Sequence, residues 1–359
     1  MSLSPGGLTR VGVVGCGVIA YWAHLRVLRR MRGATLAGAA DPNPEARERA
    51  KRLARVAVYG RAEDLIGCDD IDAVVICAPT HLHAELAVAA AAAGKHFYLE
   101  KPIATTIQDA QRVTEAAAVA GVTAAMGFNR RHHPLYQQAR QILRGGHIGR
   151  VRAVQTAFCE PIPADTMPEW KQRRATGGGV LLDLGSHHID LLRWFLGDEV
   201  AGIAASIQSQ LSEQDTARLE LWMQSGVEVQ SFFSFRAARA DFLEFIGERG
   251  TLRIDRHSPV LAMRLGRRFG YGTRRRWIPP TIPVARWRLH RLVRPSTDPS
   301  YRRSLQAFID RVRNIPGHVA SLADGVRSLE AILSAEESGY SVKSGLVQDR
   351  PVRVPCVPC

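Results

Sequence analysis

Short β-branched runs alternate with alanine-rich stretches in the first third of the chain, and this alternation restricts the fold more than any other feature of the sequence. The expected strands are 10–15, 35–40, 73–77, 96–99 and 122–126, and the expected helices are 20–31, 44–53, 83–93 and 107–120. Gly94 and Gly121 follow two of these helices, where a left-handed C-cap favours glycine. Strands and helices that alternate in this way are typical of βαβ units around a parallel sheet.

The pattern changes after about residue 128. Runs of alternating apolar and polar residues follow at 152–158, 217–223, 227–235, 243–246 and 251–254, and they predict a large, mostly antiparallel open sheet with one buried face. Further helices are expected at 181–196, 305–312 and 322–337. A chain of 359 residues has room for two domains of ordinary size. The predicted fold class is α/β, with a parallel-sheet domain at 1–128 and an α+β domain at 129–359.

Two glycines stand between the first expected strand and the first expected helix, in the run Gly15-x-Gly17-x-x-Ala20. Gly15 permits a tight turn, Gly17 lets backbone N–H groups approach a pyrophosphate, and Ala20 lets the helix pack closely. The helix N-terminus, which begins near Val18 and Ile19, then faces the phosphates. This turn predicts a dinucleotide-binding site in residues 1–128.

An acidic residue follows the second expected strand. Asp41 lies 26 residues after Gly15 and could accept hydrogen bonds from the ribose hydroxyls of an adenosine, while its charge would repel a 2′-phosphate. Pro42 and Asn43 come next, rather than a basic residue. The cofactor is therefore predicted to be NAD, although Arg47 could turn inward and hold the extra phosphate of NADP.

A lysine follows the fourth expected strand, in the run Glu100-Lys101-Pro102. Open α/β sheets bind their ligands at the carboxyl ends of the strands. An ammonium group at this edge could donate a hydrogen bond to the oxygen of a carbonyl or hydroxyl group that undergoes hydride transfer. The alternative is a surface lysine paired with Glu100.

The start of the expected helix 181–196 carries the richest motif. Asp183 and His187 are four residues apart and should share one helical face. A histidine can take a hydroxyl proton near neutral pH, and a nearby carboxylate can orient its ring. We therefore expect Asp183 to hold His187 for proton transfer, while His188 points about 100° away. The full motif is Gly177-Gly178-Gly179-x-x-x-Asp183-x-Gly185-x-His187-x-x-Asp190.

Together these motifs resemble the Gfo/Idh/MocA family of oxidoreductases, and the resemblance covers essentially the whole chain. It implies a Rossmann domain followed by an open-sheet domain that forms a homodimer or homotetramer. It also implies NAD(P)-dependent oxidation or reduction of a secondary alcohol or ketone of a sugar, nucleotide sugar or cyclitol. The motifs that carry it are Gly15-Cys16-Gly17-Val18-Ile19-Ala20, Ala78-Pro79-Thr80-His81-Leu82-His83, Glu100-Lys101-Pro102 and the run from Gly177 to Asp190.

The resemblance also assigns roles to individual residues. It implies that Lys101, Asp183 and His187 are catalytic, and no metal site is expected. The residues expected around the cofactor are Gly15, Gly17, Val18, Ile19, Asp41, Pro79, Thr80, His83, Glu100, Lys101 and Asn129. Arg130 matches the family segment that lines the nicotinamide and substrate cleft. Apart from the resemblance, residues 160–174 are expected to contribute to the substrate pocket, with Trp170, Lys171 and Arg173 as the candidates, and His188 is expected at its rim. The substrate could carry a phosphate group. The alternative is a non-catalytic protein that senses NAD(H) and contacts nucleic acid or a partner through its basic segment.

That basic segment holds most of the net charge of +14. Residues 264–303 contain twelve arginines and one acidic residue, Asp298, which gives +11. Pro279, Pro280, Pro283 and Pro295 predict an irregular loop. The segment is interpreted either as a solvated insertion or as a surface for an anionic substrate, carrier or lipid. Nucleic acid is disfavoured because no recognised binding module accompanies the charge.

The remaining features point to a cytoplasmic protein. Cysteines at 16, 68, 77, 159, 356 and 359 do not form a disulfide framework. The first ten residues lack the apolar run of a secretory signal, and no stretch of about 18 apolar residues could span a bilayer. The terminal run Cys356-Val-Pro-Cys359 lacks a second cysteine pair, so it is expected to be a frayed tail.

Overall fold

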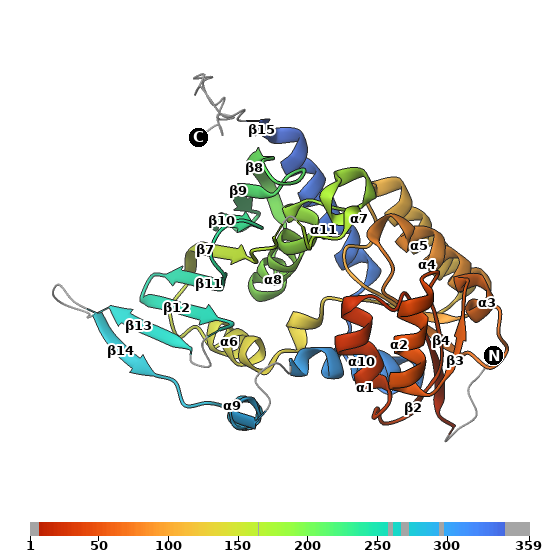
Figure 1. The fold of residues 1–359 in the computed structure, drawn as a ribbon. Coiled ribbons are helices and arrows are strands. Elements are labelled where there is room, and N and C mark those ends of the chain that lie inside the picture. The colour runs from red at the N-terminus through yellow and green to blue at the C-terminus, as the bar shows by residue number, and fades with distance from the viewer. Residues whose placement is uncertain (1–6, 164, 258–260, 267–272, 294–297, 342–359) are drawn as a thin grey trace.

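The computed structural model describes residues 7–163, 165–257, 261–266, 273–293 and 298–341. In this part of the chain two sheets lie at opposite sides of the molecule, with helices between and around them (Figure 1). The terminal run Cys356-Val-Pro-Cys359 lies outside the described residues, as do 267–272 and 294–297 of the basic segment.

The first sheet is parallel, as the sequence predicted. Its strands run in the order β3-β2-β1-β4-β5-β6, which is the strand order of the Rossmann fold. The order reverses between β1 and β4, and the loops at their carboxyl ends diverge there, so this edge is where a ligand is expected. The strands are β1 (Thr9–Val14), β2 (Ala34–Ala40), β3 (Ala57–Tyr59), β4 (Ala73–Ile76), β5 (His96–Leu99) and β6 (Ala124–Met126).

Helices cover both faces of this sheet, and η marks the short 3₁₀ and π turns among them. They are η1 (Ala20–His24), α1 (Leu25–Leu28), α2 (Pro44–Ala54), α3 (Ala62–Ile66), η2 (Thr80–Leu82), α4 (His83–Ala92) and α5 (Ile107–Ala120). A late helix, α10 (Pro299–Val312), joins them. Its Leu305 and Phe308 belong to the same buried cluster as Val11 and Val13 of β1. The chain therefore returns to the first sheet after residue 298, and the boundary at 128/129 stays a prediction.

The second sheet is mostly antiparallel and has the order β14-β13-β12-β11-β7-β10-β9-β8-β15 within the described ranges. Only its β10–β7 and β15–β8 pairs are parallel there. Residues along β9 alternate between buried and exposed, as expected for a sheet with one covered face. The strands are β7 (Val151–Cys159), β8 (Val200–Gln208), β9 (Thr216–Met223), β10 (Glu228–Ser234), β11 (Ala240–Gly247), β12 (Gly250–Asp255), β13 (Ala262–Gly266), β14 (Thr273–Trp277) and β15 (Tyr340–Ser341).

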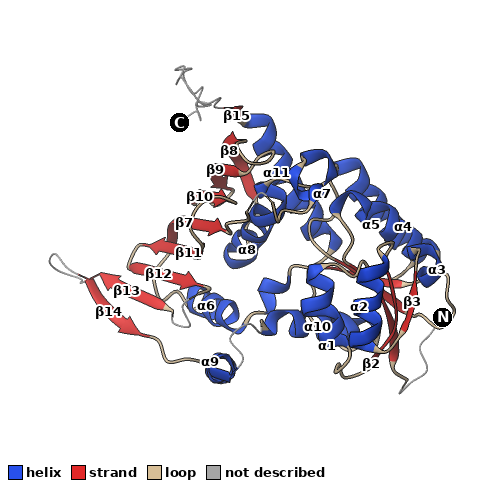
Figure 2. Ribbon diagram, in the orientation of Figure 1, coloured by secondary structure: helices blue, strands red, loops and turns tan. Residues whose placement is uncertain are grey.

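Helices between the two sheets join them, as Figure 2 shows. Helix α8 (Ser186–Leu196) packs on the second sheet, where the rings of Phe195 and Phe245 lie 5.0 Å apart. Helix α11 (Leu322–Ser338) contacts β8, α8 and α5, and so touches both halves. The other elements are η3 (Asn129–His132), α6 (Pro134–Arg144), α7 (Glu169–Gln172), η4 (Arg174–Thr176), η5 (Leu181–Gly185) and α9 (Ile282–Val293). None of the helices in the described ranges is long and apolar enough to cross a bilayer.

The prediction of an irregular loop in the basic segment is wrong for most of its described part, although residues 278–281, which include Pro279 and Pro280, do form a loop. The alternating residues of β13 pair with β12 and extend the second sheet, and β14 pairs with β13. Pro283 lies in the first turn of α9, where its missing N–H costs nothing. In the sequence, a proline in the first turn of a helix, such as Pro283, could not be distinguished from a proline in a loop.

Candidate active site

The glycine turn after β1 has the shape that a dinucleotide requires. Gly15 has a φ of +86°, and a Cβ added there would lie 2.8 Å from the backbone of Cys77 and Ala78. A Cβ added at Gly17 would meet no heavy atom within 4 Å, and both Gly17 and Val18 are exposed. The turn is therefore packed against β4 on one side and open on the other. Its exposed backbone at the start of a helical segment fits a pyrophosphate.

Asp41 lies beside this turn at the carboxyl end of β2. Its Oδ2 accepts a hydrogen bond from the Cys16 amide at 2.7 Å, and its Oδ1 accepts one from the Asn43 amide at 2.8 Å. These bonds fix the carboxylate at the edge of the turn, where it is still partly exposed. Arg47 is close by, because its Nη1 donates to the carbonyls of Asp41 and Pro42, each at 2.8 Å. The structure thus brings both candidate selectivity groups, Asp41 and Arg47, to one edge.

The central feature of the site is a carboxylate held by two lysines. Lys101, after β5, donates from Nζ to Oδ1 of Asp183 and to its backbone carbonyl, each at 2.7 Å. Lys171, in α7, donates to Oδ2 at 2.6 Å. Burial would raise the pKa of the Asp183 carboxyl, but the two ammonium groups outweigh it and hold this pKa well below its usual range. A lysine from the first half of the chain therefore meets the helix 181–196 motif of the second half.

The expected pairing of Asp183 with His187 does not form. In the described residues no hydrogen bond joins them, and Nδ1 of His187 is buried without a partner. Asp183 lies in the π turn η5, so its relation to residue 187 differs from that in a regular α-helix. Burial, together with the positive charges of Arg130 and Lys101, lowers the pKa of His187 well below its usual value. The imidazole is therefore neutral near pH 7 and able to accept a proton.

The glycine triplet allows three segments to meet at this point. Gly177 has a φ of +96°, and a Cβ there would lie 2.3 Å from Cβ of Thr80 in the loop after β4. A Cβ on Gly178 would lie 2.3 Å from the carbonyl oxygen of Lys171. Larger residues would push η5 away from the first domain and from α7. The triplet is thus needed to bring Asp183 within reach of both lysines.

Two of the predicted substrate residues are instead tied into a buried ionic network. Arg130 and Asp241 are only 3% and 1% exposed, and they form an ion pair at 3.0 Å. Nε2 of His188 lies 3.2 Å from the same carboxylate, and its ring stacks on Phe158. The guanidinium of Arg130 lies 4.1 Å from the centre of the Phe158 ring. Arg130 and His188 therefore form the wall behind His187 rather than a solvent-facing rim.

The network continues to the start of α10. Arg256 reaches Asp241 at 3.4 Å and Asp298 at 2.5 Å, and Asp298 also caps α10 through the Ser300 amide at 2.8 Å. Asn129 donates to Oγ of Ser300 at 2.8 Å and is buried. The predicted cofactor residue Asn129 thus connects η3 to α10 and lies beneath the site.

The remaining predicted cofactor residues surround the loops after β4 and β5. Thr80 is buried beneath Gly177, whereas Pro79 is partly exposed. The ring of His83 lies 2.7 Å from the Pro102 carbonyl and 2.9 Å from the Ala78 carbonyl. His83 therefore fixes one loop against the other. Ile19, in the glycine turn, is partly exposed.

Glu100 is buried and makes a contact that the sequence analysis did not predict. Its Oε1 lies 2.7 Å from Nε2 of His24, which is fully buried, and its Oε2 accepts from the Lys101 amide at 3.2 Å. Glu100 therefore orients the backbone that carries Lys101 rather than pairing with its ammonium. A sequence signal for His24 existed, since it shares an inward helical face with Ala20 and Leu28.

The structure separates the three residues that were predicted from 160–174. Lys171 reaches the site, Trp170 lies partly exposed beside it with its ring centre 5.7 Å from the lysine Nζ, and Arg173 is exposed. Asp241 was not among the residues predicted from the sequence. Its signal was an acidic residue on the same face of a strand as the buried Leu243 and Phe245.

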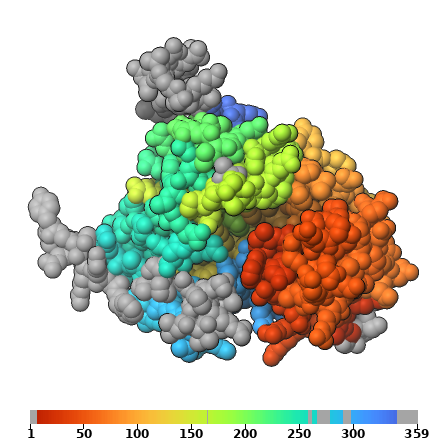
Figure 3. Space-filling view, viewed as in Figure 1, coloured from red at the N-terminus to blue at the C-terminus, as the bar shows by residue number. Residues whose placement is uncertain are grey.

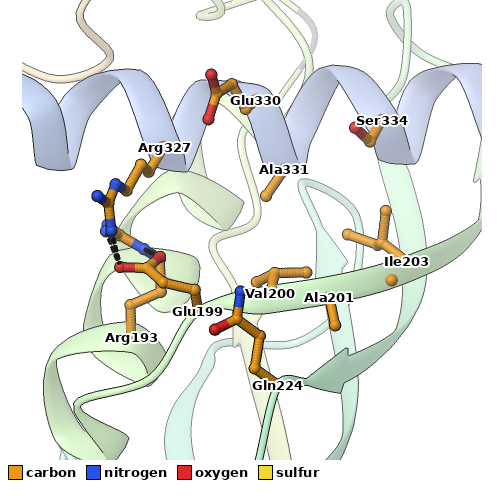
Figure 4. A pocket seen from close by; sticks show the side chains of 11 residues that line it. Arg193, Glu199, Val200, Ala201, Ile203, Gln224, Arg327, Glu330, Ala331 and Ser334 are labelled. Carbon is orange, nitrogen blue, oxygen red and sulfur yellow. Dashed lines mark hydrogen bonds and ion pairs between the residues drawn. The ribbon is translucent and has the colours of Figure 1, made fainter.

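An open groove of about 630 Å³ between α11 and β8 is separate from this site (Figure 4). The predicted site residues do not line it. Glu199 accepts hydrogen bonds there from Arg193 and Arg327, each at 2.5 Å, so its charge is already paired. Its lining residues are Arg193, Glu199, Val200, Ala201, Gly202, Ile203, Gln224, Arg327, Glu330, Ala331 and Ser334.

Comparison with known proteins identifies two family regions in the sequence. Residues 9–128 match the oxidoreductase family with an NAD-binding Rossmann fold, and residues 136–253 match the GFO/IDH/MocA C-terminal domain. The first region ends where the predicted Rossmann domain ends, and the second contains Asp183 and His187.

Relatives with assigned activities extend along most of the chain. Myo-inositol 2-dehydrogenase of Thermotoga maritima is 27% identical and covers 96% of this chain and 98% of its own. The dTDP-3,4-didehydro-2,6-dideoxy-alpha-D-glucose 3-reductase of Streptomyces violaceoruber is 31% identical over 70% of this chain and 76% of its own. The fold is similar to that of KijD10, a 3-ketoreductase from Actinomadura kijaniata solved with NADP and TDP-benzene. That match has a TM-score of 0.79 and 24% identity, and it covers 94% of this chain and 99% of the other.

Proposed function

Because the chain belongs to the Gfo/Idh/MocA family of oxidoreductases, we propose that Lys101 and His187 carry out proton transfer for hydride exchange between NAD and its substrate. The protein is a nicotinamide-dependent oxidoreductase that acts on a secondary alcohol or ketone of a sugar, nucleotide sugar or cyclitol. The observation that supports the catalytic assignment is the contact of Lys101 with Asp183, one turn from His187, whose ring is neutral and which is partly exposed.

In the oxidative direction His187 removes the proton from the substrate hydroxyl. Its unpaired, neutral ring is suited to this step because burial disfavours the charged imidazolium until a negative alkoxide develops beside it. Lys101 donates a hydrogen bond to the same oxygen and stabilises the developing charge. Asp183 positions Lys101, in place of the role toward His187 that the sequence suggested.

The cofactor would be held by the glycine turn at 15–20, by Asp41 and by the loops that contain Pro79, Thr80 and Glu100. When bound, the nicotinamide supplies the hydride chemistry, whereas the protein supplies orientation and charge. The open face at Gly17 and the fixed carboxylate of Asp41 support this placement. We further propose a homodimer or homotetramer in the cytoplasm, and a substrate that could carry phosphate.

The direct test of this function is NADH absorbance with purified protein and a panel of inositols, free sugars and nucleotide sugars, in both directions. We expect turnover with at least one class, faster with NAD than with NADP. Absence of turnover with every class and both cofactors, combined with tight binding of NADH, would instead support the sensing protein.

The preference for NAD is expected to depend on the charge of Asp41. Asp41→Asn keeps an acceptor for the Cys16 amide but removes the repulsion of a 2′-phosphate, while Arg47 stays beside it. The ratio of kcat/KM for NAD to that for NADP should fall at least about tenfold, which corresponds to roughly 1.4 kcal/mol. Steady-state kinetics with the two cofactors measures it. A ratio that stays the same would show that Asp41 does not select the cofactor.

A further inference from the structure

The carboxylate of Asp183 is paired with two lysines, the proposed catalytic Lys101 and a second one, Lys171. Lys101 occupies Oδ1 at 2.7 Å and Lys171 occupies Oδ2 at 2.6 Å, so both oxygens are engaged. The side chain of Asp183 is 18% exposed, and those of Lys101 and Lys171 are 13% and 22% exposed. A carboxylate this sheltered is costly to leave without a cation.

The position of Lys171 is fixed by the loop that carries it. Its amide donates to the Pro168 carbonyl at 2.9 Å, and Oγ1 of Thr176 donates to the Trp170 carbonyl at 2.7 Å. Gly178 lies against the Lys171 carbonyl, where no Cβ would fit. The ammonium lies 6.0 Å from the centre of the Phe235 ring and 5.7 Å from that of Trp170. The fold thus builds a place for this one cation.

We propose that Lys171 is a positioning residue that keeps Asp183 paired while Lys101 turns its ammonium to the oxygen of the substrate. This inference rests on the proposed function of Lys101. Without Lys171, the movement of Lys101 would leave a sheltered carboxylate without a counter-charge, and the Lys101–Asp183 pair would resist opening. With Lys171 in place, Oδ2 stays paired and Lys101 is free to act. Lys171 therefore acts through Asp183 rather than by contact with the substrate.

The kinetic test compares Lys171→Met and Lys171→Arg with the wild-type enzyme on whichever substrate it turns over. Lys171→Met should lower kcat about tenfold or more with little change in KM. Lys171→Arg should restore most of kcat. Lys51→Met, on the exposed surface of α2, is the matched control and should change neither kcat nor KM.

A raised KM with an unchanged kcat would overturn the proposal and make Lys171 a substrate-binding residue. A second measurement needs no turnover and separates this proposal from the proposed function. Lys171→Met should lower the urea midpoint of the free protein when Asp183 is present and much less in the Asp183→Asn background. Equal shifts in both backgrounds would show that Lys171 does not act through Asp183.

The outer face of α9 carries a second inference, from a different observation. Ile282 and Leu289 are 77% and 68% exposed, and Arg286 is exposed on the same stripe of the helix. The opposite face is packed: Val284 is fully buried, and the ring of Trp287 lies 4.6 Å from that of the buried His133. Helix α9 therefore has apolar side chains on its exposed face as well as on its packed face.

This helix belongs to the segment that holds +11 of the net charge, and it lies at the lower margin of the molecule in Figure 3. We infer that the outer face of α9 rests on the surface of an anionic phospholipid bilayer. Arginines attract such a surface, and exposed aliphatic side chains enter its apolar boundary. A nucleic acid backbone would use the arginines but not Ile282 or Leu289. A second copy of the chain would bring two strongly positive segments together.

Flotation of the full-length protein with vesicles tests this surface. We expect binding to vesicles of equal parts phosphatidylcholine and phosphatidylglycerol, and none to phosphatidylcholine alone. The double variant Ile282→Ser/Leu289→Ser and the variant Arg286→Glu should each weaken binding several-fold. Val119→Ser is the matched control, because Val119 is 91% exposed on α5. Equal binding to both vesicles, unchanged binding of the variants, or tighter binding to duplex DNA than to anionic vesicles would each overturn the inference.

Discussion

Replacement of Lys101 by methionine is expected to lower kcat at least about a hundredfold, the usual scale for a group that assists proton transfer. Methionine keeps most of the side-chain volume but cannot donate a hydrogen bond to the substrate oxygen. Asp183 keeps its contact with Lys171, so the local fold should survive. His187→Ala should cause a loss of similar size, because the neutral base is removed. Steady-state kinetics measures both losses, and NADH fluorescence should show unchanged cofactor binding.

Lys51→Met serves again as the control for loss of a positive charge from the first domain. If Lys101→Met or His187→Ala turned over substrate as fast as the wild type, the replaced residue would have no role in proton transfer. A variant that lost cofactor binding together with turnover would point to a structural effect, since neither side chain is needed for the pyrophosphate turn.

Asp241→Asn is expected to reduce the free energy of unfolding by about 3 kcal/mol or more, because it leaves the guanidinium of Arg130 buried without its counter-ion. Arg256 keeps Asp298, so Arg130 bears most of the loss. Burial alone would raise the pKa of Asp241, but Arg130, His188 and Arg256 together hold it well below its usual range. The stabilisation from this carboxylate is therefore present above its unfolded-state pKa and is lost as the pH falls toward its folded-state value.

Urea denaturation near neutral pH measures the change. Glu248→Gln is the matched control, since it breaks the pair of Arg152 with Glu248 at 2.5 Å, whose side chains are 58% and 45% exposed. An exposed pair of this kind contributes about 1 kcal/mol at most. Equal losses for the two variants would show that the network around Asp241 contributes no more than an ordinary surface pair.

Features that depend on neighbouring residues were predictable from the sequence. The first two strands of the parallel sheet, the glycine turn and Asp41 follow one another within the first 41 residues, and the structure places them together. The alternation in 217–223 predicted β9 almost to its ends. Strand β8 was missed because Ala201, Gly202, Ala204 and Ala205 give it little alternation in hydrophobicity.

Features that depend on distant residues were predicted less well. Helical spacing predicted a pair between Asp183 and His187. In the structure Asp183 lies in a π turn and pairs with Lys101 and Lys171 instead. Arg130 was expected to face the substrate, yet its counter-ion is Asp241, 111 positions away. The prolines of the basic segment suggested a loop, whereas pairing with β12 made part of it a strand.

The sequence by itself determined the two-part architecture, the turn that suits a dinucleotide, and the kinds of side chain available for proton transfer, because these follow from local backbone demands and periodic burial. Only the tertiary structure decided which charges pair. The energy of an ion pair depends on distance through space and on exclusion of water, and neither quantity can be read from the spacing of residues such as Lys101 and Asp183, which lie 82 positions apart.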